Sequence, residues 1–358
     1  MNLLNLTPEA GRAEVERWLA TRGEASYRAG QILPRLWERP VPAWSEATDL
    51  PCELRAALQE TFPLPRLSLV TEQVSKDGTR KFLWALPDRA LIESVLIPEG
   101  ERRTLCISSQ AGCAYGCVFC ATGRMGFGRH LEAWEILGQL RELALDPATG
   151  KPTNVVFMGM GEPLHNWEAV DRALTVLNQR EGFGIGARHI TVSTVGIVPR
   201  LKDLAARPEQ FRLAVSLHAP THERRLALMP VERKYGLSEL MPALSAFERR
   251  LTFEYVLIQG ANDTMEDADR LARLARPLGA HVNLLPLHPG GTPGLVPTPP
   301  SDMRRFARRL REWGVTATVR RSRGLDIDAA CGQLRVAAGG GREVATHQHG
   351  HVEQAAGV

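Results

Sequence analysis

Cys113-Ala114-Tyr115-Gly116-Cys117-Val118-Phe119-Cys120 holds three cysteines within eight residues and directly follows a strand predicted at 104–109. A loop at the end of a strand is able to wrap around an inorganic cluster. Three thiolates leave one iron of a 4Fe-4S cluster open for another ligand. A structural zinc site completed by Cys106 or a histidine is the alternative, because closely spaced thiolates also suit tetrahedral zinc.

The chain from this strand onward alternates short apolar runs with segments of helical length. Strands are predicted near 104–109, 154–158, 189–194, 211–218, 251–258 and 281–287. Helices are predicted near 131–145, 166–179, 237–250, 265–277 and 301–313. These strand and helix units predict an α/β fold with a parallel barrel or partial barrel of six strands. Because the chemistry of such barrels lies at the carboxyl ends of the strands, the residues that follow each run are candidate site residues.

The part of the chain before the cysteines has a different pattern. Thr7-Pro8-Glu9 has the pattern of a helix start, and residues 1–65 are predicted to form a small helical domain. Strands at 67–74 and 80–86 flank the turn signal Asp77-Gly78, and a third strand follows at 91–97. Residues 66–100 are therefore predicted to link the helical domain to the barrel at 101–336. Residues 337–358 are predicted to be a disordered tail, with metal binding by His347, His349 and His351 as the alternative.

The bulk composition narrows the class of protein. The chain has 358 residues, 44% hydrophobic content, a net charge of +4 and a pI near 8.8, which permits a polyanionic partner without requiring one. It has no run of about eighteen apolar residues and no basic, then apolar, signal peptide, so a cytoplasmic protein without a membrane segment is predicted. In such a protein, clustered cysteines indicate metal binding or catalysis rather than disulfides.

Polar groups follow several of the later predicted strands. Gly159-Met160-Gly161-Glu162-Pro163 follows the second strand, where glycines permit close approach of a ligand and Glu162 can accept a hydrogen bond from an ammonium group. An ordinary strand-end turn is the alternative. Ser193 ends the third strand, and Ser216-Leu217-His218 ends the fourth. These groups suit ribose and carboxylate contacts, although single hydroxyls of this kind are also common as core or capping residues.

Several motifs resemble those of a known family. The CxxxCxxC spacing with an aromatic residue before the last cysteine resembles the signature of the radical S-adenosylmethionine (SAM) superfamily, and Gly159–Pro163 resembles its GGEP motif. RTLCISSQAGC at 103–113, GMGEPL at 159–164 and DIDAACGQL at 326–334 are similar to the bacterial dual-specificity 23S rRNA and tRNA adenosine C2-methyltransferases. This resemblance runs from Ser26 to Leu334.

The resemblance implies a partial six-stranded parallel (βα)6 radical SAM barrel with a small N-terminal helical domain, a 4Fe-4S cluster and SAM. The implied cluster ligands are Cys113, Cys117 and Cys120. The implied SAM contacts are Gly161, Glu162, Ser193, Ser216, Leu217 and His218. His288 stands where the family usually has an asparagine near SAM, and an imidazole can replace the amide as a polar contact. The implied partners are 23S rRNA, tRNA and an electron-donor protein such as a flavodoxin; a monomer without membrane contact is expected.

The chemistry of adenine C2 explains why such an enzyme needs two more cysteines. C2 lies between two ring nitrogens and is electron-poor, so it is a poor nucleophile, whereas a carbon radical can add to it. By resemblance, Cys331 carries the methyl group, and Cys106 then attacks the Cys331 sulfur and releases the product as a disulfide forms. Glu93 is the implied base for the C2 proton. Without the resemblance, both cysteines are typical core residues and Glu93 is a solvent-facing strand residue.

Basic residues near the end of the chain predict an RNA contact. The residues concerned are Arg304, Arg308 and Arg311 on one face of the last predicted helix, followed by Arg320, Arg321 and Arg323. Together they are predicted to frame the access of RNA, with solvated surface arginines as the alternative. Two other functions stay open. One is methylation at C8 of the same rRNA adenosine, as in the related antibiotic-resistance enzymes, and the other is a noncatalytic RNA-binding protein with a structural metal site.

Overall fold

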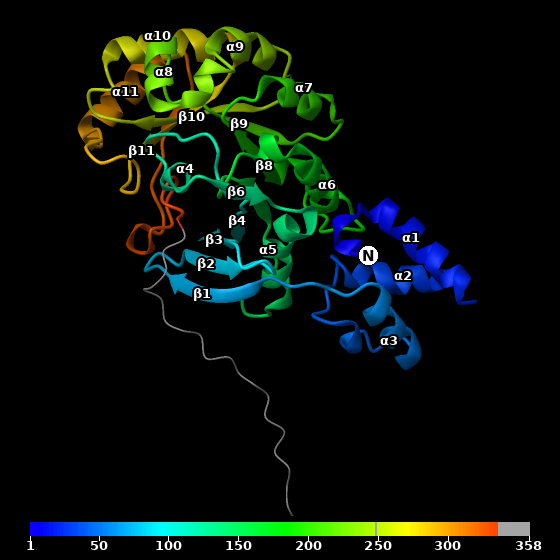
Figure 1. The fold of residues 1–358 in the computed structure, drawn as a ribbon. Helices are drawn as coiled ribbons and strands as arrows, with labels where there is room; N and C mark the ends of the chain where they lie inside the picture. Colours follow the sequence, from blue (N-terminus) through cyan, green and yellow to red (C-terminus); the bar gives the residue numbers. More distant parts are fainter. Residues whose placement is uncertain (248, 336–358) are drawn as a thin grey trace, which may run out of the picture.

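The computed structural model describes residues 1–247 and 249–335 (Figure 1). The tail predicted at 337–358, with His347, His349 and His351, lies outside the described residues. Within the ranges described, no helix is both long enough and apolar enough to cross a bilayer.

A ten-stranded mixed sheet organises the protein, with strands in the order β1-β2-β3-β4-β7-β8-β9-β10-β11-β12. The antiparallel strands are β1 (Ser68–Val74), β2 (Arg80–Ala85) and β3 (Leu91–Glu99), and β3 pairs antiparallel with β4. Every later pair is parallel: β4 (Arg102–Cys106), β7 (Asn154–Phe157), β8 (Ile190–Thr194), β9 (Arg212–Ser216), β10 (Leu251–Leu257), β11 (His281–Pro286) and β12 (Ala317–Val319). The predicted α/β class is confirmed, and β12 is a parallel strand beyond the predicted six.

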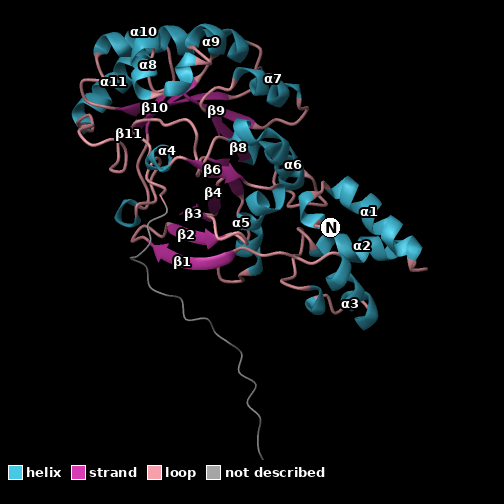
Figure 2. Ribbon diagram, viewed as in Figure 1, coloured by secondary structure: helices cyan, strands magenta, loops and turns pink. Residues whose placement is uncertain are grey.

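Helices connect the parallel strands and lie along one face of the sheet (Figure 2). They are α5 (Ala133–Leu145), α6 (Trp167–Asn178), α7 (Val198–Ala206), α8 (His222–Leu228), α9 (Leu237–Ser245), α10 (Met265–Ala275) and α11 (Pro300–Glu312). Short 3₁₀ turns include η1 (Leu3–Asn5), η3 (Leu33–Arg35), η5 (Pro163–Asn166), η6 (Ala187–His189), η7 (Pro230–Arg233) and η9 (Leu325–Ile327). The sequence did not indicate α7 and α8, which are only nine and seven residues long.

The two faces of the parallel sheet differ in chemistry because side chains alternate along each strand. One face is apolar and packs against the helices; Tyr255 of β10, for example, lies with its ring centroid 5.7 Å from that of Phe306 on α11. The strand register places the alternate residues together on the opposite face, which we call the inner face. It includes Cys106, Ser193, Ser216, Glu254 and Asn283. The inner face is therefore polar, as a site for a polar ligand requires.

The antiparallel strands, expected to link the helical domain to the barrel, extend the main sheet. Val95 of β3 lies opposite Cys106 of β4, so β3 continues the sheet beyond its first parallel strand. The turn at Asp77-Gly78 is confirmed: the Gly78 amide donates to the carbonyl of Ser75 at 3.0 Å, and Gly78 has a φ of 84°. By the same register, Glu93 and Lys81 lie on the inner face.

The N-terminal helices α1 (Pro8–Thr21), α2 (Ala29–Ile32) and α3 (Cys52–Thr61) are attached to α5. The predicted cap at Thr7 is present, since its hydroxyl accepts a hydrogen bond from the Ala10 amide at 3.3 Å. Arg141 of α5 is buried, and its guanidinium donates to the carbonyls of Leu36 at 3.1 Å and Val41 at 2.5 Å. These hydrogen bonds fix the segment between α2 and α3 to α5, which packs on the main sheet.

Arg141→Met should lower the free energy of unfolding by about 2 kcal/mol, because two buried carbonyls lose a charged donor while the apolar stem is largely retained. Urea unfolding followed by circular dichroism measures this change. Arg308→Met, on the exposed side of α11, is the control and should change the value by less than about 0.5 kcal/mol. An Arg141→Met protein as stable as the unsubstituted chain would show that these hydrogen bonds do not hold the N-terminal helices.

Candidate active site at the cysteine loop

The cysteine loop lies between two short elements, β5 (Gln110–Gly112) and α4 (Ala121–Met125). β5 pairs antiparallel with β6 (Phe127–His130), and the Cys113 amide donates to the carbonyl of Gly126 at 2.8 Å. The Val118 amide donates to the carbonyl of Leu228 at 3.0 Å, which ties the middle of the loop to the end of α8. The loop is therefore held at both ends and at its centre.

The three loop cysteines are free thiols, with Cys117 buried and Cys113 and Cys120 half-buried. Burial raises the pKa of Cys113 to about 12 and that of Cys117 well above its ordinary value. Thiols in such an environment stay neutral unless a cation stabilises the thiolate. A donor set of three soft sulfur ligands in an apolar loop thus fits an iron-sulfur cluster, whose charge would supply that stabilisation.

The alternative of a single metal ion completed by Cys106 or a histidine stays open. Among residues 1–247 and 249–335, no group of three or more His, Cys, Asp or Glu side chains is arranged to hold a metal ion. The Cys106 thiol lies close enough to Cys331 for the charge of that residue to raise its pKa.

The glycine-rich turn after β7 is pressed against the residues that precede the cysteine loop. Gly161 has a φ of 98°, and a Cβ atom there would lie 2.5 Å from the Cβ of Gln110, so no other residue fits. The Gln110 side chain accepts a hydrogen bond from the Glu162 amide at 2.8 Å. The close approach at Gly161 is thus made to the Gln110 side chain, and the approach of a ligand to this turn stays a prediction.

Glu162 is buried between the ends of neighbouring strands. Its Oε1 accepts from the Leu164 amide at 3.0 Å, and its Oε2 accepts from the Val195 amide at 2.8 Å. Burial raises the pKa of Glu162 to about 7, against the opposing effect of the Thr194 hydroxyl and these amides. With two amides and the Thr194 hydroxyl as donors, the carboxylate keeps one of its four acceptor positions, which is able to bind an ammonium.

The end of β9 carries His218 in a strained conformation beside the cysteine loop. Its φ is 56°, and its ring lies 4.5 Å, centroid to centroid, from the ring of Phe119 inside the loop. The Nδ1 atom accepts from the Val256 amide at 2.9 Å, while burial and the charge of Arg225 lower the pKa of His218 to about 3. The imidazole is therefore neutral, with its proton on Nε2. Ser193 and Ser216 lie on the inner face nearby in register.

Arg225 of α8 is a structural residue that the sequence did not indicate. It is fully buried, pairs with Glu232, and donates to the carbonyls of Val195 at 2.7 Å and Leu217 at 3.2 Å. These carbonyls follow β8 and end β9, so one side chain fixes both strand ends next to Glu162 and His218. An arginine in a short polar helix has no local signal that distinguishes it from a surface residue.

His288 lies just beyond the end of β11, as the motif predicted. Its Nε2 and the Ser322 hydroxyl are 2.7 Å apart, and burial lowers its pKa. This hydrogen bond ties the end of β11 to the segment after β12. The imidazole thus already forms a hydrogen bond with another residue of the protein. An asparagine at this position would make such a contact through its amide group instead.

The segment with Cys331 packs directly onto the cysteine loop. The Ala121 amide donates to the carbonyl of Gly332 at 2.8 Å, and the Thr122 hydroxyl donates to the carbonyl of Leu334 at 2.6 Å. Figure 1 shows this segment, in orange, passing α4 on its way to the antiparallel strands. The C-terminal motif and the cysteine motif are therefore adjacent in space.

The other side of the same segment is fixed to the turn between β1 and β2. Asp326 accepts hydrogen bonds from the Ser75 hydroxyl and, at 3.2 Å, from the Lys76 amide. The Gly324 amide donates to the Asp77 carboxylate at 3.1 Å. The Asp77-Gly78 turn thus serves as a clamp for the segment that carries Cys331.

Cys106 and Cys331 come close together although they lie far apart in the sequence. Cys106 is buried on the inner face at the end of β4; the Cys331 residue is exposed, but its thiol group is enclosed by the protein. Burial, and next the Cys331 thiol, raise the pKa of Cys106. Burial, and next the charge of Glu254, raise the pKa of Cys331 to about 11. The structure therefore brings together the two cysteines that the motifs singled out, both as free thiols.

Glu93 is buried, which contradicts the alternative of a solvent-facing strand residue. Its Oε1 lies 3.4 Å from the ammonium of Lys81, and its Oε2 accepts from the Arg335 amide at 2.8 Å. Burial raises the pKa of Glu93 despite the lysine. The carboxylate thus lies beside the last described residues of the Cys331 segment.

The predicted arginine face divides into residues with different environments. Arg304 and Arg308 are exposed on α11, but Arg311 donates to the carbonyl of Ala317 at 2.8 Å and is engaged in joining α11 to β12. Arg320 influences the charges of Cys331 and Glu254, so it lies near the inner face. Their role in framing the access of RNA stays a prediction.

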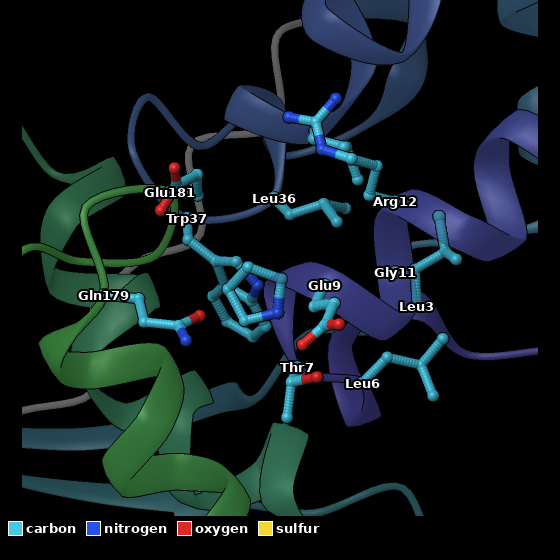
Figure 3. A pocket seen from close by; sticks show the side chains of 12 residues that line it. Leu3, Leu6, Thr7, Glu9, Gly11, Arg12, Leu36, Trp37, Gln179 and Glu181 are labelled. Carbon is cyan, nitrogen blue, oxygen red and sulfur yellow. The ribbon is translucent and has the colours of Figure 1, made fainter. Parts of the chain in front are cut away.

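A pocket beside the N-terminal helices is remote from all of these residues (Figure 3). Leu3, Leu36, Trp37 and Gln179 are among the side chains that line it, and none of the motif residues does.

Comparison with known proteins identifies the family. The model of the radical SAM superfamily matches residues 107–275, which contain the cysteine loop. A probable dual-specificity RNA methyltransferase RlmN of Gemmatimonas aurantiaca is 54% identical over 355 residues, which is 99% of each chain. The chain belongs to the RlmN family of dual-specificity RNA methyltransferases. Another probable RlmN, from Geobacillus kaustophilus, is 43% identical over 328 residues, or 90% of each chain.

A solved structure supports the same assignment to the RlmN family. The crystal structure of a radical SAM methyltransferase from Sphaerobacter thermophilus superimposes with a TM-score of 0.87 and 45% identity, covering 94% of this chain and 99% of that one. The resemblance drawn from the motifs is thus confirmed, and with it the prediction of an enzyme of the radical SAM superfamily.

In this member of the RlmN family, loss of the Asp326 carboxylate should loosen the Cys331 segment. Asp326→Ala removes the hydrogen bonds from Ser75 and Lys76, so backbone amides at 329–334 should exchange with deuterium about tenfold faster. Hydrogen-exchange mass spectrometry measures this. Asp203→Ala, which removes a surface ion pair with Arg200, should leave that exchange unchanged. Equal protection in both variants would mean that the clamp does not hold the segment.

Proposed function

We propose that this chain methylates C2 of an adenosine in 23S rRNA, and also in tRNA, with a methyl group carried on Cys331. Membership of the RlmN family supports RNA as the substrate. The observation that carries the proposal is the meeting of Cys331, Cys106 and the cysteine loop in one place. A noncatalytic RNA-binding protein has no need for two free thiols positioned in this way.

The residues available for the cofactors follow from the site. Cys113, Cys117 and Cys120 hold a 4Fe-4S cluster, and the proposed SAM contacts are Gly161, Glu162, Ser193, Ser216, Leu217, His218 and His288. When bound, the cluster and SAM supply the methyl group and a carbon-centred radical that removes a hydrogen atom. The electron comes from a donor protein such as a flavodoxin, acting on a monomeric enzyme.

Cys331 carries the methyl group, and Cys106 releases the methylated product. The Cys331 sulfur takes the methyl group and loses its proton. Once a hydrogen atom has been removed from that methyl group, its carbon bonds to C2 of the adenine, and the adduct gives up one electron, which the bound cluster would accept, and the C2 proton, which Glu93 takes. The Cys106 thiol loses its proton and attacks the Cys331 sulfur; the sulfur–carbon bond breaks, the released carbon takes up a proton to become the product methyl group, and a disulfide forms. Two external electrons and two protons restore the thiols before the next turnover. Free thiols at both positions match the reduced state that begins this cycle.

Glu93 is the proposed base for the proton that leaves C2. Its burial keeps it away from bulk water, and Lys81 limits the rise of its pKa without preventing it. A base with a raised pKa retains a proton more firmly once it has accepted one. The Arg335 amide orients Oε2, which leaves the carboxylate with one fixed direction.

Substitution of each thiol should stop the reaction at a different stage. Cys331→Ala should form no methylated adenosine while retaining the iron-sulfur absorbance, because the methyl carrier is lost and the cluster ligands are not. Cys106→Ala should accumulate protein joined to RNA by a thioether, visible on a denaturing gel and resistant to thiol reductants. Cys52→Ala, at an exposed position on α3, is the control and should methylate RNA normally.

Nucleoside analysis of the RNA product completes this test. Methylated RNA from Cys331→Ala would exclude the carrier role, and 8-methyladenosine in place of 2-methyladenosine would favour the C8 reaction of the antibiotic-resistance enzymes.

Replacing the carboxylate of Glu93 by an amide should slow product release and flatten the dependence of the methylation rate on pH. Glu93→Gln should lower the methylation rate about 100-fold, because the amide cannot accept the C2 proton. The unsubstituted enzyme should lose activity as the pH falls through the raised pKa, since the base becomes protonated. Rates measured across this pH range test both points, with Glu72→Gln on β1 as the control. A Glu93→Gln enzyme with the normal rate and pH profile would remove Glu93 from the mechanism.

A further inference from the structure

The amino ends of the parallel strands carry a group of four arginines that the function described so far does not use. Arg102 begins β4, Arg188 lies in η6 just before β8, Arg212 begins β9, and Arg250 directly precedes β10. Parallel strands start at the same edge of a sheet, so these side chains gather there. Direct pairing supports this, because the Leu213 amide donates to the carbonyl of Arg250 at 3.3 Å. We call this group the arginine edge.

The arginine edge differs from the neighbouring arginines in its ion pairing within the described part of the chain. Throughout residues 1–247 and 249–335, none of its four guanidinium groups forms an ion pair. Nearby Arg207, in contrast, pairs with both Asp171 and Glu209. Like charges held together without a counter-ion repel one another, and an anion relieves that repulsion.

The arginines of this group lie close enough to affect one another's pKa values. Burial, and then Arg250, Arg102 and Arg188, lower the pKa of Arg212. For neighbouring His281 at the start of β11, burial lowers the pKa, the Asn283 side chain opposes this, and Arg250 and Arg320 add to the lowering. The positive charge of Arg250 is therefore felt at both β9 and β11.

The arginine edge opens onto the inner face. The inner face carries Arg102, Thr104 and Cys106, which are alternate residues of β4. It also carries Arg212, Ala214 and Ser216, which are alternate residues of β9. At about 3.3 Å per residue, the four steps from Arg212 to Ser216 span about 13 Å. A nucleotide turned out of its strand can extend over such a length while its phosphates remain outside.

Two of the arginines predicted from the sequence lie on another surface. Arg304 and Arg308 are on α11, whose Phe306 packs against Tyr255 on the apolar face of the sheet. A strand of RNA bound along α11 would therefore be separated from Cys106 and Cys331 by the sheet itself. Arg320, in contrast, lies near the inner face, as the arginine edge does.

We propose that the arginine edge binds the phosphate backbone of the RNA substrate, so that the target adenosine reaches the inner face from the amino ends of the strands. The inference rests on the proposed function, in which RNA is the substrate. Guanidinium groups match phosphate in geometry, and four of them on separate strands suit successive phosphates of a chain better than one small anion. The SAM contacts lie at the opposite, carboxyl ends, so the two ligands approach the reacting sulfur from different sides.

Two charge-matched double variants test this proposal. Arg188→Gln/Arg250→Gln and Arg304→Gln/Arg308→Gln each remove two exposed positive charges, one pair from the arginine edge and the other from α11. Binding of an anticodon stem-loop RNA is measured from about 50 to 200 mM salt, the range over which phosphate contacts dominate the change in affinity. Thermal unfolding midpoints of both variants establish that they fold equally well.

The edge variant should bind RNA about tenfold more weakly than the unsubstituted protein, and its salt dependence in a log–log plot should be shallower by about 1.5 to 2. The α11 variant should bind at least several times more tightly than the edge variant. Arg188→Lys/Arg250→Lys keeps the charge and should restore the salt dependence.

Three results would contradict the inference or its basis. An edge variant that binds RNA like the unsubstituted protein overturns the proposal while leaving the methylation of RNA in place. An α11 variant that loses as much affinity, or more, overturns it in favour of the other surface. A protein that binds the RNA but forms no methylated adenosine under reducing conditions with SAM refutes the proposed function instead.

Discussion

The hydrogen bond from the Ala121 amide to the carbonyl of Gly332 is the contact on which the proposed chemistry depends. It joins the loop that offers three thiols to the segment that offers Cys331, and neither segment is near the other in sequence. Radical reactions need their partners within contact distance, because the reactive species has to be consumed before it meets solvent. The Asp77-Gly78 clamp on the far side of the segment keeps this contact from depending on one hydrogen bond alone.

Burial raises the pKa values of the thiols and carboxyl groups of the site alike, with different consequences for each. Burial keeps the Cys106 and Cys117 thiols protonated until Cys117 binds a cation or Cys106 reacts with another sulfur. In the protonated form both thiols are protected from adventitious oxidation. For Glu93 and Glu162 it raises the pKa, yet each carboxylate is held by amides or a lysine, so neither is an uncompensated charge. Arg225 shows the same rule for a cation, since Glu232 and two strand-end carbonyls surround it.

The sequence was sufficient where the determining interactions are local. The alternation of apolar runs and helical segments predicted the parallel sheet, and the motifs predicted the family. The sequence did not predict the structure where the determining contacts join residues that lie far apart in the chain. β12 has only three residues, too few for a pattern, and is a strand because β11 pairs with it. Strands β1–β3 resembled a linker until β3 was found paired with β4. Arg225 and Asp326 act through partners that no local spacing reveals.

The direction of the strands gives the protein two chemically different ends. At the carboxyl ends, buried Glu162 and neutral His218 offer acceptors and donors for a zwitterion. At the amino ends, four guanidinium groups that form no ion pair within residues 1–247 and 249–335 concentrate positive charge. A polyanion at the carboxyl ends would meet the buried carboxylate of Glu162, whereas at the amino ends it would meet this positive charge. In the proposed arrangement, the inner face connects the two ends over one strand length, so that each ligand approaches Cys331 from its own side. The same short parallel strands would then separate SAM from RNA and bring both to the Cys331 sulfur.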